Sequence, residues 1–263
     1  MPDALVLAGG RPDPALPQGV PNKAFVPLCG RTMVEFVLEA LRAASSVRRV
    51  AMVGPDPLPP TVRPYLNLAI GDRGSMLDNV AAGLSALSST DRVLAAAADI
   101  PLLTPEAVDA FITAARSLDA DIVYSVVRRE DVVREAPEIR KTSVRLREGT
   151  FTGGSLILLE PRAFGRVRTV LDRAVRARKR PWELAGLFGL RAVVGLLTGT
   201  LTIPDLERRA ALLTGIRAKA LICRAPEVAI DVDTPEMLAA VSARLTQRLH
   251  PAAPRPPERT VRP

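Results

Sequence analysis

A glycine pair followed by a lysine is the first group of residues that could do chemistry. The apolar run Ala4–Leu7 ends in Ala8-Gly9-Gly10, and a proline-rich loop then leads to Lys23. Glycine lets backbone N–H groups approach a phosphate or a base closely, and a lysine can neutralise phosphate charge. The spacing matches neither GxGxxG nor GxxxxGKS, which disfavours a Rossmann dinucleotide site and a P-loop. A simple Gly-Gly turn without a ligand is the alternative interpretation.

Three aspartates form the second group. Asp99 follows the apolar run 92–98. Asp231 and Asp233 follow another apolar run late in the chain, and strand alternation would put them on the same side of the backbone. Mg²⁺ prefers one or two carboxylates together with phosphate oxygens, so the three acids are candidate metal ligands. Turn capping by Asp99, and helix capping by Asp233 or Thr234, are the alternatives.

Alternating strands and helices would position both groups. The sequence predicts strands in the apolar runs 4–7, 50–53, 68–70, 92–98, 122–127, 156–159, 219–223 and 228–232. It predicts helices after the capping residues Thr32, Ser75, Thr104 and Thr234. This alternation is typical of an α/β fold with a mostly parallel sheet and helices on both faces. The carboxyl ends of such strands share one edge, where ligands bind.

The chain length and a change of pattern after Pro161 define the domain organisation. The 263 residues suffice for one large α/β domain or two small ones. We expect one domain over residues 1–249, with a helical insert at about 161–217. Residues 250–263 are rich in proline and arginine and carry little apolar surface, so a disordered tail is expected.

The composition restricts the classes of partner. Apolar residues make up 48% of the chain and aromatic residues 3%, which excludes global disorder and disfavours a single-strand nucleic-acid binder with aromatic platforms. Lys and Arg outnumber Asp and Glu by 36 to 28, and the net charge of +8 favours anionic partners. Cys29 and Cys223 form no CxxC or Cys/His cluster, and no signal peptide is recognisable, so a reduced cytoplasmic protein is expected. His250 lies in the tail and is expected to be neither base nor ligand.

A basic run and an apolar stretch lie within the insert. Five basic residues are spread over Arg173–Arg180, and we favour a solvated surface for them over contact with a phosphorylated acceptor or with anionic lipid. The stretch Leu184–Ile203 has about the length of a membrane span, but Arg191 stands near its middle. A pair of short buried helices or a docking hairpin is therefore expected there, and a peripheral membrane role is not favoured.

Four motifs occur along the chain in a characteristic order. They are LAGG (7–10), NKAFVPLCGRTMVEFVLEAL (22–41), AADIPLLTPE (97–106) and DVDTPEML (231–238), which together span most of residues 4–245. In order and spacing they resemble the MobA-like nucleotidyltransferases, a group that includes molybdenum cofactor guanylyltransferase and sugar-phosphate nucleotidyltransferase domains. The resemblance implies a Rossmann-like, mostly parallel mixed sheet of the nucleotide-diphospho-sugar transferase type.

The resemblance also implies a role for each matching position. Nucleotide binding would fall to Leu7, Ala8, Gly9, Gly10, Lys23, Gly74, Ser75 and Asn79, and acceptor binding to Gly153, Gly154 and Ser155. The metal ligands would be Asp99 and Asp233, with Asp231 nearby. The family's opening loop usually continues Gly-Gly-x-Ser-x-Arg-Met, whereas this chain reads GGRPDPALPQGVPNK. Arg11 would then replace the missing arginine as a catalytic residue beside Lys23.

The implied reaction is a Mg²⁺-dependent nucleotidyl transfer. An acceptor phosphate or hydroxyl attacks the α-phosphate of an NTP in line, and pyrophosphate leaves. The expected partners are an NTP and a small, phosphorylated acceptor, without nucleic acid, in a monomer or a homodimer. A glycosyltransferase of related fold, with Asp231-Val232-Asp233 as the metal clamp for a nucleotide sugar, is one alternative. A non-catalytic nucleic-acid-binding or regulatory protein on a degenerate enzyme scaffold is another.

Overall fold

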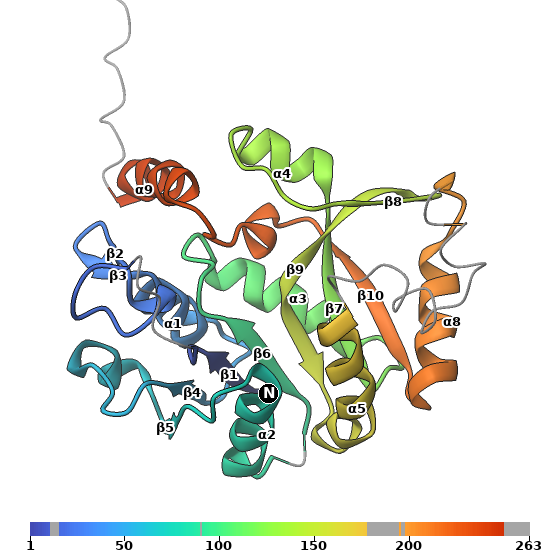
Figure 1. The fold of residues 1–263 in the computed structure, drawn as a ribbon, viewed down its shortest axis with the longest axis horizontal. Coiled ribbons are helices and arrows are strands. Elements are labelled where there is room, and N and C mark those ends of the chain that lie inside the picture. Colours follow the sequence, from blue (N-terminus) through green and yellow to red (C-terminus); the bar gives the residue numbers. More distant parts are fainter. Residues whose placement is uncertain (11–15, 90, 178–194, 196–197, 250–263) are drawn as a thin grey trace, which may run out of the picture.

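The computed structural model describes residues 1–10, 16–89, 91–177, 195 and 198–249, and most strands among them belong to one large sheet (Figure 1). Eight strands of this described part form it, in the order β10-β7-β9-β6-β1-β4-β5, with β8 paired to β9. Their bounds are β1 Asp3–Leu7, β4 Val50–Gly54, β5 Leu68–Gly71, β6 Val93–Ala97, β7 Ile122–Arg128, β8 Val144–Leu146, β9 Gly149–Leu159 and β10 Ala218–Cys223. A separate ribbon consists of β2 Pro27–Leu28 and β3 Arg31–Thr32.

Most neighbouring strands of the large sheet run parallel. β1 pairs in parallel with β4 and β6, β4 with β5, and β7 with β10. The strand β9 is the exception, because it runs antiparallel between β6 and β7 and also pairs antiparallel with β8. The sheet is therefore mixed and mostly parallel, which confirms the fold class predicted from the sequence.

The helices begin where the capping residues predict. Thr32, Ser75, Thr104 and Thr234 precede α1 Met33–Ala43, α2 Met76–Leu87, α3 Pro105–Arg116 and α9 Pro235–Leu249. The hydroxyls of Ser75 and Thr104 accept from backbone N–H groups in the first turn, at 3.1 and 3.2 Å, and so satisfy donors that the helix itself leaves unpaired. The other described helices are α4 Arg129–Glu135, α5 Pro161–Ala177 and α8 Ile203–Thr214, and the 3₁₀ turns are η1 Lys23–Phe25, η2 Pro60–Tyr65 and η3 Pro226–Ala229.

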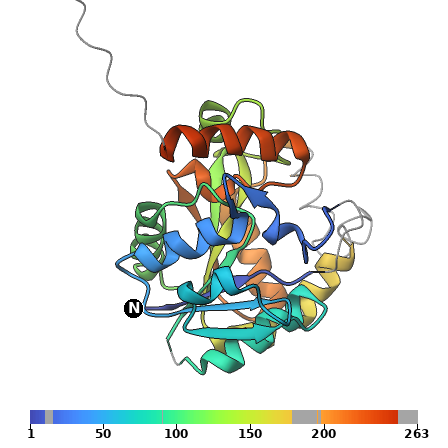
Figure 2. The ribbon, with the colours of Figure 1, turned by 90° about the vertical axis from the view of Figure 1, so that its left-hand side faces the viewer.

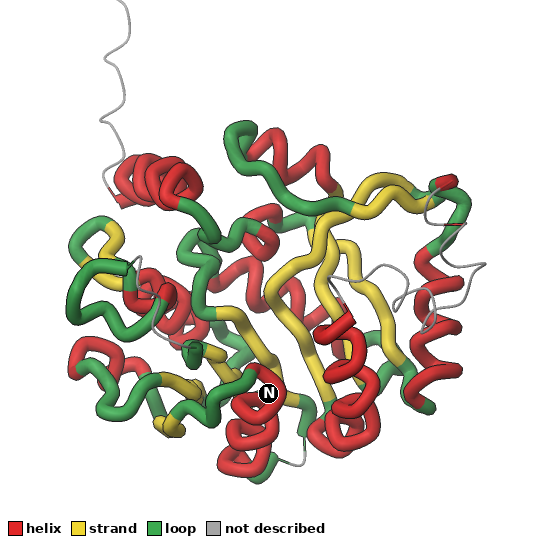
Figure 3. Tube along the Cα trace, in the orientation of Figure 1, coloured by secondary structure: helices red, strands yellow, loops and turns green. Residues whose placement is uncertain are grey.

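Helices lie on both faces of the sheet, as the ribbon and tube views show (Figures 2 and 3). Along β1, Ala4 and Val6 pack into a core shared with α1, α3 and α9, whereas Leu5 packs on the other face with α2 and α5. Alternate residues of a strand point to opposite faces, so one buried strand contributes to both layers. The helix α2 approaches β1 so closely that a Cβ atom on Gly83 would come within 2.4 Å of the Leu5 side chain. The missing side chain at Gly83 permits this packing.

One predicted strand is wrong. Residues 228–232 form no strand, and the turn η3 occupies the start of the run instead. Ile230 is fully buried, but an apolar run of this length does not distinguish a strand from another buried segment. The short helix α4 and the strand β8 were not predicted.

The insert is helical in the part that the structure describes. It contains α5 and α8, and α8 packs along β10 (Figure 1). The side chains of the basic run 173–180, most of the stretch 184–203 and the tail 250–263 lie outside the described residues. Among the described helices, none combines the length and the apolar character that a membrane crossing needs. The proposed extents of the domain and of its insert stay predictions.

A carboxylate on α3 fastens the turn that follows α1. Asp109 accepts from the backbone N–H groups of Ser45 and Ser46, at 3.0 and 2.8 Å, and also from both hydroxyls. Burial by itself would raise the pKa of Asp109, but these hydrogen bonds outweigh it and lower the pKa from 3.8 to about 2. The contact joins two helices on the same face of the sheet.

The substitution Asp109→Asn should lower the free energy of unfolding at pH 7 by about 1–2 kcal/mol, a value reduced for the partial exposure of the carboxylate. The folded-state pKa lies below the unfolded value, so the stabilisation is complete above roughly pH 4 and is lost as the pH falls towards about 2. Urea unfolding of both proteins at neutral and acidic pH measures the difference. Asp119→Asn is the control: its side chain is 85% exposed, and because its ion pair with Arg217 lies at the surface, the free energy should change by less than about 0.5 kcal/mol. A difference that persists undiminished in acid would contradict this account.

Candidate functional site

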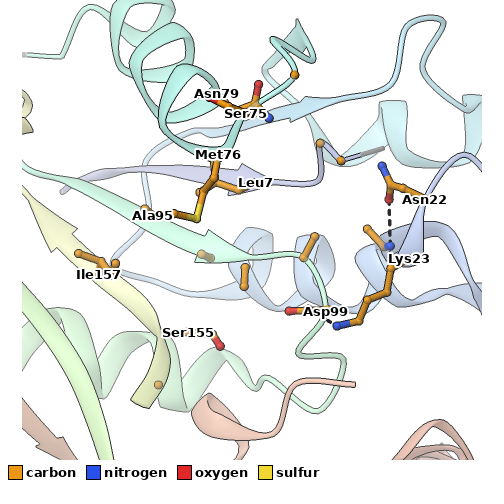
Figure 4. A pocket seen from close by; sticks show the side chains of 18 residues that line it. Leu7, Asn22, Lys23, Ser75, Met76, Asn79, Ala95, Asp99, Ser155 and Ile157 are labelled. Carbon is orange, nitrogen blue, oxygen red and sulfur yellow. Dashed lines mark hydrogen bonds and ion pairs between the residues drawn. The ribbon is translucent and has the colours of Figure 1, made fainter. Parts of the chain in front are cut away.

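A cavity of about 620 Å³ opens at the carboxyl ends of β1 and β6. It lies between the start of α2 and the turn after β6 (Figure 4). Its walls come from several segments of the chain: Leu7, Gly9, Gly10, Asn22, Lys23, Ala24, Gly74, Ser75, Met76, Asn79, Ala95–Asp99, Gly154, Ser155 and Ile157. This is the edge at which parallel strands place a ligand.

Asn22 determines where Lys23 lies at this edge. The side-chain Nδ2 of Asn22 donates to the carbonyl oxygen of Ala8 at 2.8 Å, and its Oδ1 accepts from the backbone N–H of Ala24 at 3.0 Å. The first bond ties the loop back to the end of β1, and the second caps the 3₁₀ turn that begins at Lys23. Because Asn22 is buried, both bonds are shielded from water. The long loop after Gly10 therefore returns Lys23 to the carboxyl end of β1.

Asp72 joins the glycine pair to the loop before α2. Its carboxylate accepts from the backbone N–H groups of Gly10 and Gly74, at 2.9 and 2.8 Å, and from Nδ2 of Asn79 at 2.8 Å. Burial raises the pKa of Asp72, but these hydrogen bonds outweigh it, so the pKa lies below its ordinary value and the group stays ionised. A Cβ atom on Gly9 would come within 2.3 Å of Asn79 Nδ2. The two loops therefore pack as one unit along the cavity wall.

Three acids from distant parts of the sequence meet at the end of β6. The backbone N–H of Val232 donates to the carbonyl oxygen of Asp99 at 2.9 Å and holds the segment 231–233 against the turn after β6. Asp99, Asp231 and Asp233 each offer one carboxylate oxygen, and these oxygens lie within 4.8 Å of one another. The structure thus brings together the three acids that the sequence singles out.

Two lysines neutralise most of this negative charge. Lys23 Nζ lies 2.7 Å from Oδ2 of Asp99 and also pairs with Asp233 (Figure 4 shows Lys23 and Asp99). Lys141, whose side chain is 15% exposed, pairs with Asp231. Burial alone would lower the pKa of Lys23, but the attraction of Asp99 and Asp233 outweighs it and raises the pKa. At Lys141 burial prevails over the same two acids, and the pKa is lowered.

This cluster fits a divalent cation such as Mg²⁺. Each of the three carboxylates can offer an oxygen to one ion, and oxygen is the ligand that Mg²⁺ prefers. Lys23 already pairs with two of these carboxylates and its pKa is raised, so positive charge is favoured where it lies. Asp99 also lines the cavity, so a cation at this point would face the phosphate oxygens of a ligand bound there.

The strand β9 forms another wall of the cavity. Gly154 and Ser155 line it, whereas Gly153 does not. The register between β7 and β9 shifts at Ser125, whose hydroxyl donates to the carbonyl oxygen of Leu156 at 2.8 Å and accepts from its backbone N–H at 3.1 Å. A Cβ atom on Gly154 would come within 2.3 Å of Ser125 Oγ, so only glycine fits where the strands approach.

Most residues to which the sequence assigns a role gather around this cavity. Those that line it are Leu7, Gly9, Gly10, Lys23, Gly74, Ser75, Asn79, Asp99, Gly154 and Ser155. Asp231 and Asp233 lie beside it through their approach to Asp99. Ala8 and Gly153 are not in its lining, and the carbonyl oxygen of Ala8 holds Asn22 instead. Arg11 lies outside the described residues.

Sequence reasoning missed Asp72 and Lys141 and assigned no role to Asn22. Asn22 directly precedes Lys23, and Asp72 follows a predicted strand, so their positions were signals that could have identified them. No comparable signal marks Lys141, which lies in the loop between α4 and β8. Its place at the acidic cluster becomes visible only in the folded chain.

Comparison with solved structures finds this fold in several proteins. A hypothetical transferase from Thermus thermophilus is 42% identical, with a TM-score of 0.81 over 90% of this chain and 99% of that one. CMP:2-keto-3-deoxy-manno-octonic acid synthetase complexed with CTP is 15% identical, with a TM-score of 0.62 over 94% of this chain and 99% of that one. The 2-C-methyl-D-erythritol 4-phosphate cytidylyltransferase of Thermus thermophilus is 17% identical, with a TM-score of 0.52 over 93% of this chain and 99% of that one. The last two likenesses concern the fold alone.

A family-level match covers most of the chain. None of the curated proteins compared with the sequence matches it. The MobA-like NTP transferase domain, in contrast, matches residues 4–181, a region that contains the glycine pair, Lys23 and Asp99. The chain therefore belongs to the MobA-like NTP transferase family.

Proposed function

We propose that the protein is a Mg²⁺-dependent nucleotidyltransferase that transfers a nucleoside monophosphate from an NTP to a small, phosphorylated acceptor. The observation that carries this proposal is the meeting of Lys23, Asp99 and Asp233 at the rim of a cavity bordered by the glycine pair. Membership of the family supports it. So do the names of two proteins of the same fold, a synthetase complexed with CTP and a cytidylyltransferase.

The two ends of the cavity suit the two ends of a nucleotide. The glycine pair and the residues Gly74 and Ser75 offer backbone groups and little bulk to a base and its ribose. Small alanine side chains at 95–98 leave room beside them. Lys23 and Asp99 lie on the other side of the cavity from Ser75, where they would meet the phosphates (Figure 4). Gly154 and Ser155 on β9 remain the proposed contacts for the acceptor.

In the proposed reaction an acceptor oxygen attacks the α-phosphorus in line. A bond forms between that oxygen and phosphorus, the bond to the bridging oxygen of the β-phosphate breaks, and pyrophosphate leaves. An attacking phosphate oxygen is already deprotonated near neutral pH, so no general base is required. The ammonium group of Lys23 would stabilise charge on the leaving phosphates. Mg²⁺ held by Asp99, Asp231 and Asp233 would supply a Lewis acid that polarises the transferred phosphate.

An activity screen separates this function from its alternatives. Each of the four NTPs is incubated with Mg²⁺ and a panel of phosphorylated sugars, alcohols and pterins, and pyrophosphate is measured. Release of a nucleoside diphosphate from nucleotide sugars, without pyrophosphate from NTPs, would identify a glycosyltransferase. Inactivity combined with duplex or RNA affinity that falls steeply with salt would identify a nucleic-acid-binding protein.

Asp99→Asn should reduce pyrophosphate release by about 100-fold or more, because several kcal/mol of transition-state stabilisation depend on the metal site. Asparagine keeps the shape of the side chain, so thermal unfolding should stay close to that of the wild type. The matched control is Asp119→Asn on the exposed surface, which should retain full activity. Unchanged pyrophosphate release in the Asp99 variant would exclude Asp99 from the metal site.

Lys23→Ala should lower kcat/KM for the NTP by about 10- to 100-fold, because it removes a charge-assisted contact to the phosphates. Steady-state kinetics with the NTP as the varied substrate measure this loss. Lys219→Ala removes a lysine that pairs with Glu207 away from the cavity, and it should retain wild-type kinetics. If the Lys23 variant also shows wild-type kinetics, Lys23 does not contact the NTP.

A further inference from the structure

Lys141 is the second lysine at the acidic cluster. It pairs with Asp231, its side chain is only 15% exposed, and Asp99, Asp233 and Lys23 act on it electrostatically. Removing an ammonium group from water costs free energy that one carboxylate partner does not always restore. The chain has four lysines in all, and two of them lie at this one cluster.

The loop that carries Lys141 is fastened on both sides. Arg244 of α9 donates to the carbonyl oxygen of Glu135, at the end of α4, with distances of 2.9 and 3.1 Å. The hydroxyl of Thr152 on β9 donates to the carbonyl oxygen of Thr142 at 3.0 Å. The helices α4 and α9 lie at the same end of the molecule in both ribbon views (Figures 1 and 2). The structure thus presents Lys141 on an anchored loop.

The two lysines approach the cluster from different sides. Lys23 lines the nucleotide cavity, whereas Lys141 does not. Lys141 comes instead from the side of β9, since the next residue, Thr142, is bonded to Thr152. Thr152 lies only two positions before Gly154, a proposed acceptor contact in the cavity wall. Lys141 therefore belongs to the acceptor side of the cluster.

The balance of charge indicates what Lys141 does when the site is loaded. Three carboxylates share two ammonium groups, so the cluster by itself carries one negative charge. With a divalent cation on the same carboxylates, the sum becomes one positive charge, and both lysines lose part of the attraction that now holds them. Lys23 then faces the phosphates of the NTP. Lys141, on the other side, needs a different anion.

We propose that Lys141 binds an anionic group of the acceptor, either a phosphate or a carboxylate, and so positions the acceptor's attacking oxygen across the cluster from the NTP. The role rests on the proposed function, because it requires a nucleotide and an acceptor in the same site. It makes Lys141 the residue that selects negatively charged acceptors over neutral ones. Recognition of the nucleotide stays with the residues around the glycine pair.

A purely structural role makes a different prediction. If Lys141 served only as the counterion of Asp231, then Lys141→Gln would disturb a proposed metal ligand and would weaken the binding of the nucleotide analogue with Mg²⁺ as well as the binding of an anion. If Lys141 binds the acceptor, Lys141→Gln lowers the affinity for an anion and leaves the affinity for the nucleotide analogue unchanged.

The experiment measures anion binding to the full chain by NMR titration, with Mg²⁺ and the non-hydrolysable α,β-methylene analogues of the four NTPs. The probes are glycerol 3-phosphate and glycerate, and glycerol is the neutral control. The wild type is compared with Lys141→Gln and Lys141→Arg, and the affinity for the nucleotide analogue is measured for each protein. Lys219→Gln is the matched control, since Lys219 also pairs with an acid but lies away from the cluster. Thermal unfolding verifies that each variant is folded.

We expect Lys141→Gln to raise the Kd of at least one anionic probe about tenfold or more, and Lys141→Arg to keep it within about threefold of the wild type. Lys219→Gln should bind the anionic probes with the Kd of the wild type. The affinity for the nucleotide analogue should be the same in all of these proteins. The probe that responds shows whether the anion is a phosphate or a carboxylate.

Three results would overturn the role of Lys141 while nucleotide binding persists. They are the absence of anion binding to the wild-type complex, equal Kd values for the wild type and Lys141→Gln, and a loss of nucleotide-analogue affinity in Lys141→Gln that matches its loss of anion affinity. Failure of all four analogues to bind in the presence of Mg²⁺ is a separate result. It refutes the proposed function, and the inference with it.

Discussion

Carboxylates that lie within 4.8 Å of one another repel, and the arrangement of this site depends on how their repulsion is balanced. Here Lys23 lies against Asp99 and Asp233, and Lys141 lies against Asp231. Each lysine loses contact with water as it approaches, and the opposite charges outweigh that cost at Lys23 but not at Lys141. The same oxygens are of the kind that Mg²⁺ accepts, so in the proposed function Mg²⁺ would take over part of the balance that the lysines supply.

Hydrogen bonds of the backbone and of one neutral side chain, Asn22, bring these charges together. Asp99 directly follows a buried parallel strand, and the N–H of Val232 bonds to its carbonyl oxygen, so the segment with the other two acids must lie alongside. On the opposite side, the buried Asn22 ties the long loop to the end of β1 and delivers Lys23. Neutral hydrogen bonds thus set the geometry, and they do not depend on the charge of an ion or a ligand.

The two ends of the cavity offer a ligand different kinds of contact. Along the glycine pair, close packing of Gly9 against Asn79 and the bonds of Asp72 keep two loops in contact, and the ligand would meet backbone groups. At the other end, Lys23 and Asp99 line the cavity. This polarity suits a ligand with a flat, weakly charged head and a highly charged tail. The antiparallel strand β9 closes the space between the ends, and Ser125 and Gly154 set how near it comes.

Local patterns in the sequence determined most of the fold and one side of the site. Apolar runs and capping residues such as Ser75 and Thr104 act over a few neighbouring residues, so the ends of strands and the starts of helices could be predicted. The positions of Asp99 and the glycine pair at strand ends followed from them. The run 228–232 was wrongly predicted as a strand because a buried strand and a buried turn have equally apolar sequences. Only the tertiary structure decided that Lys141 meets Asp231. Ion pairs between distant segments leave no periodic trace in a sequence, since they depend on how whole elements pack.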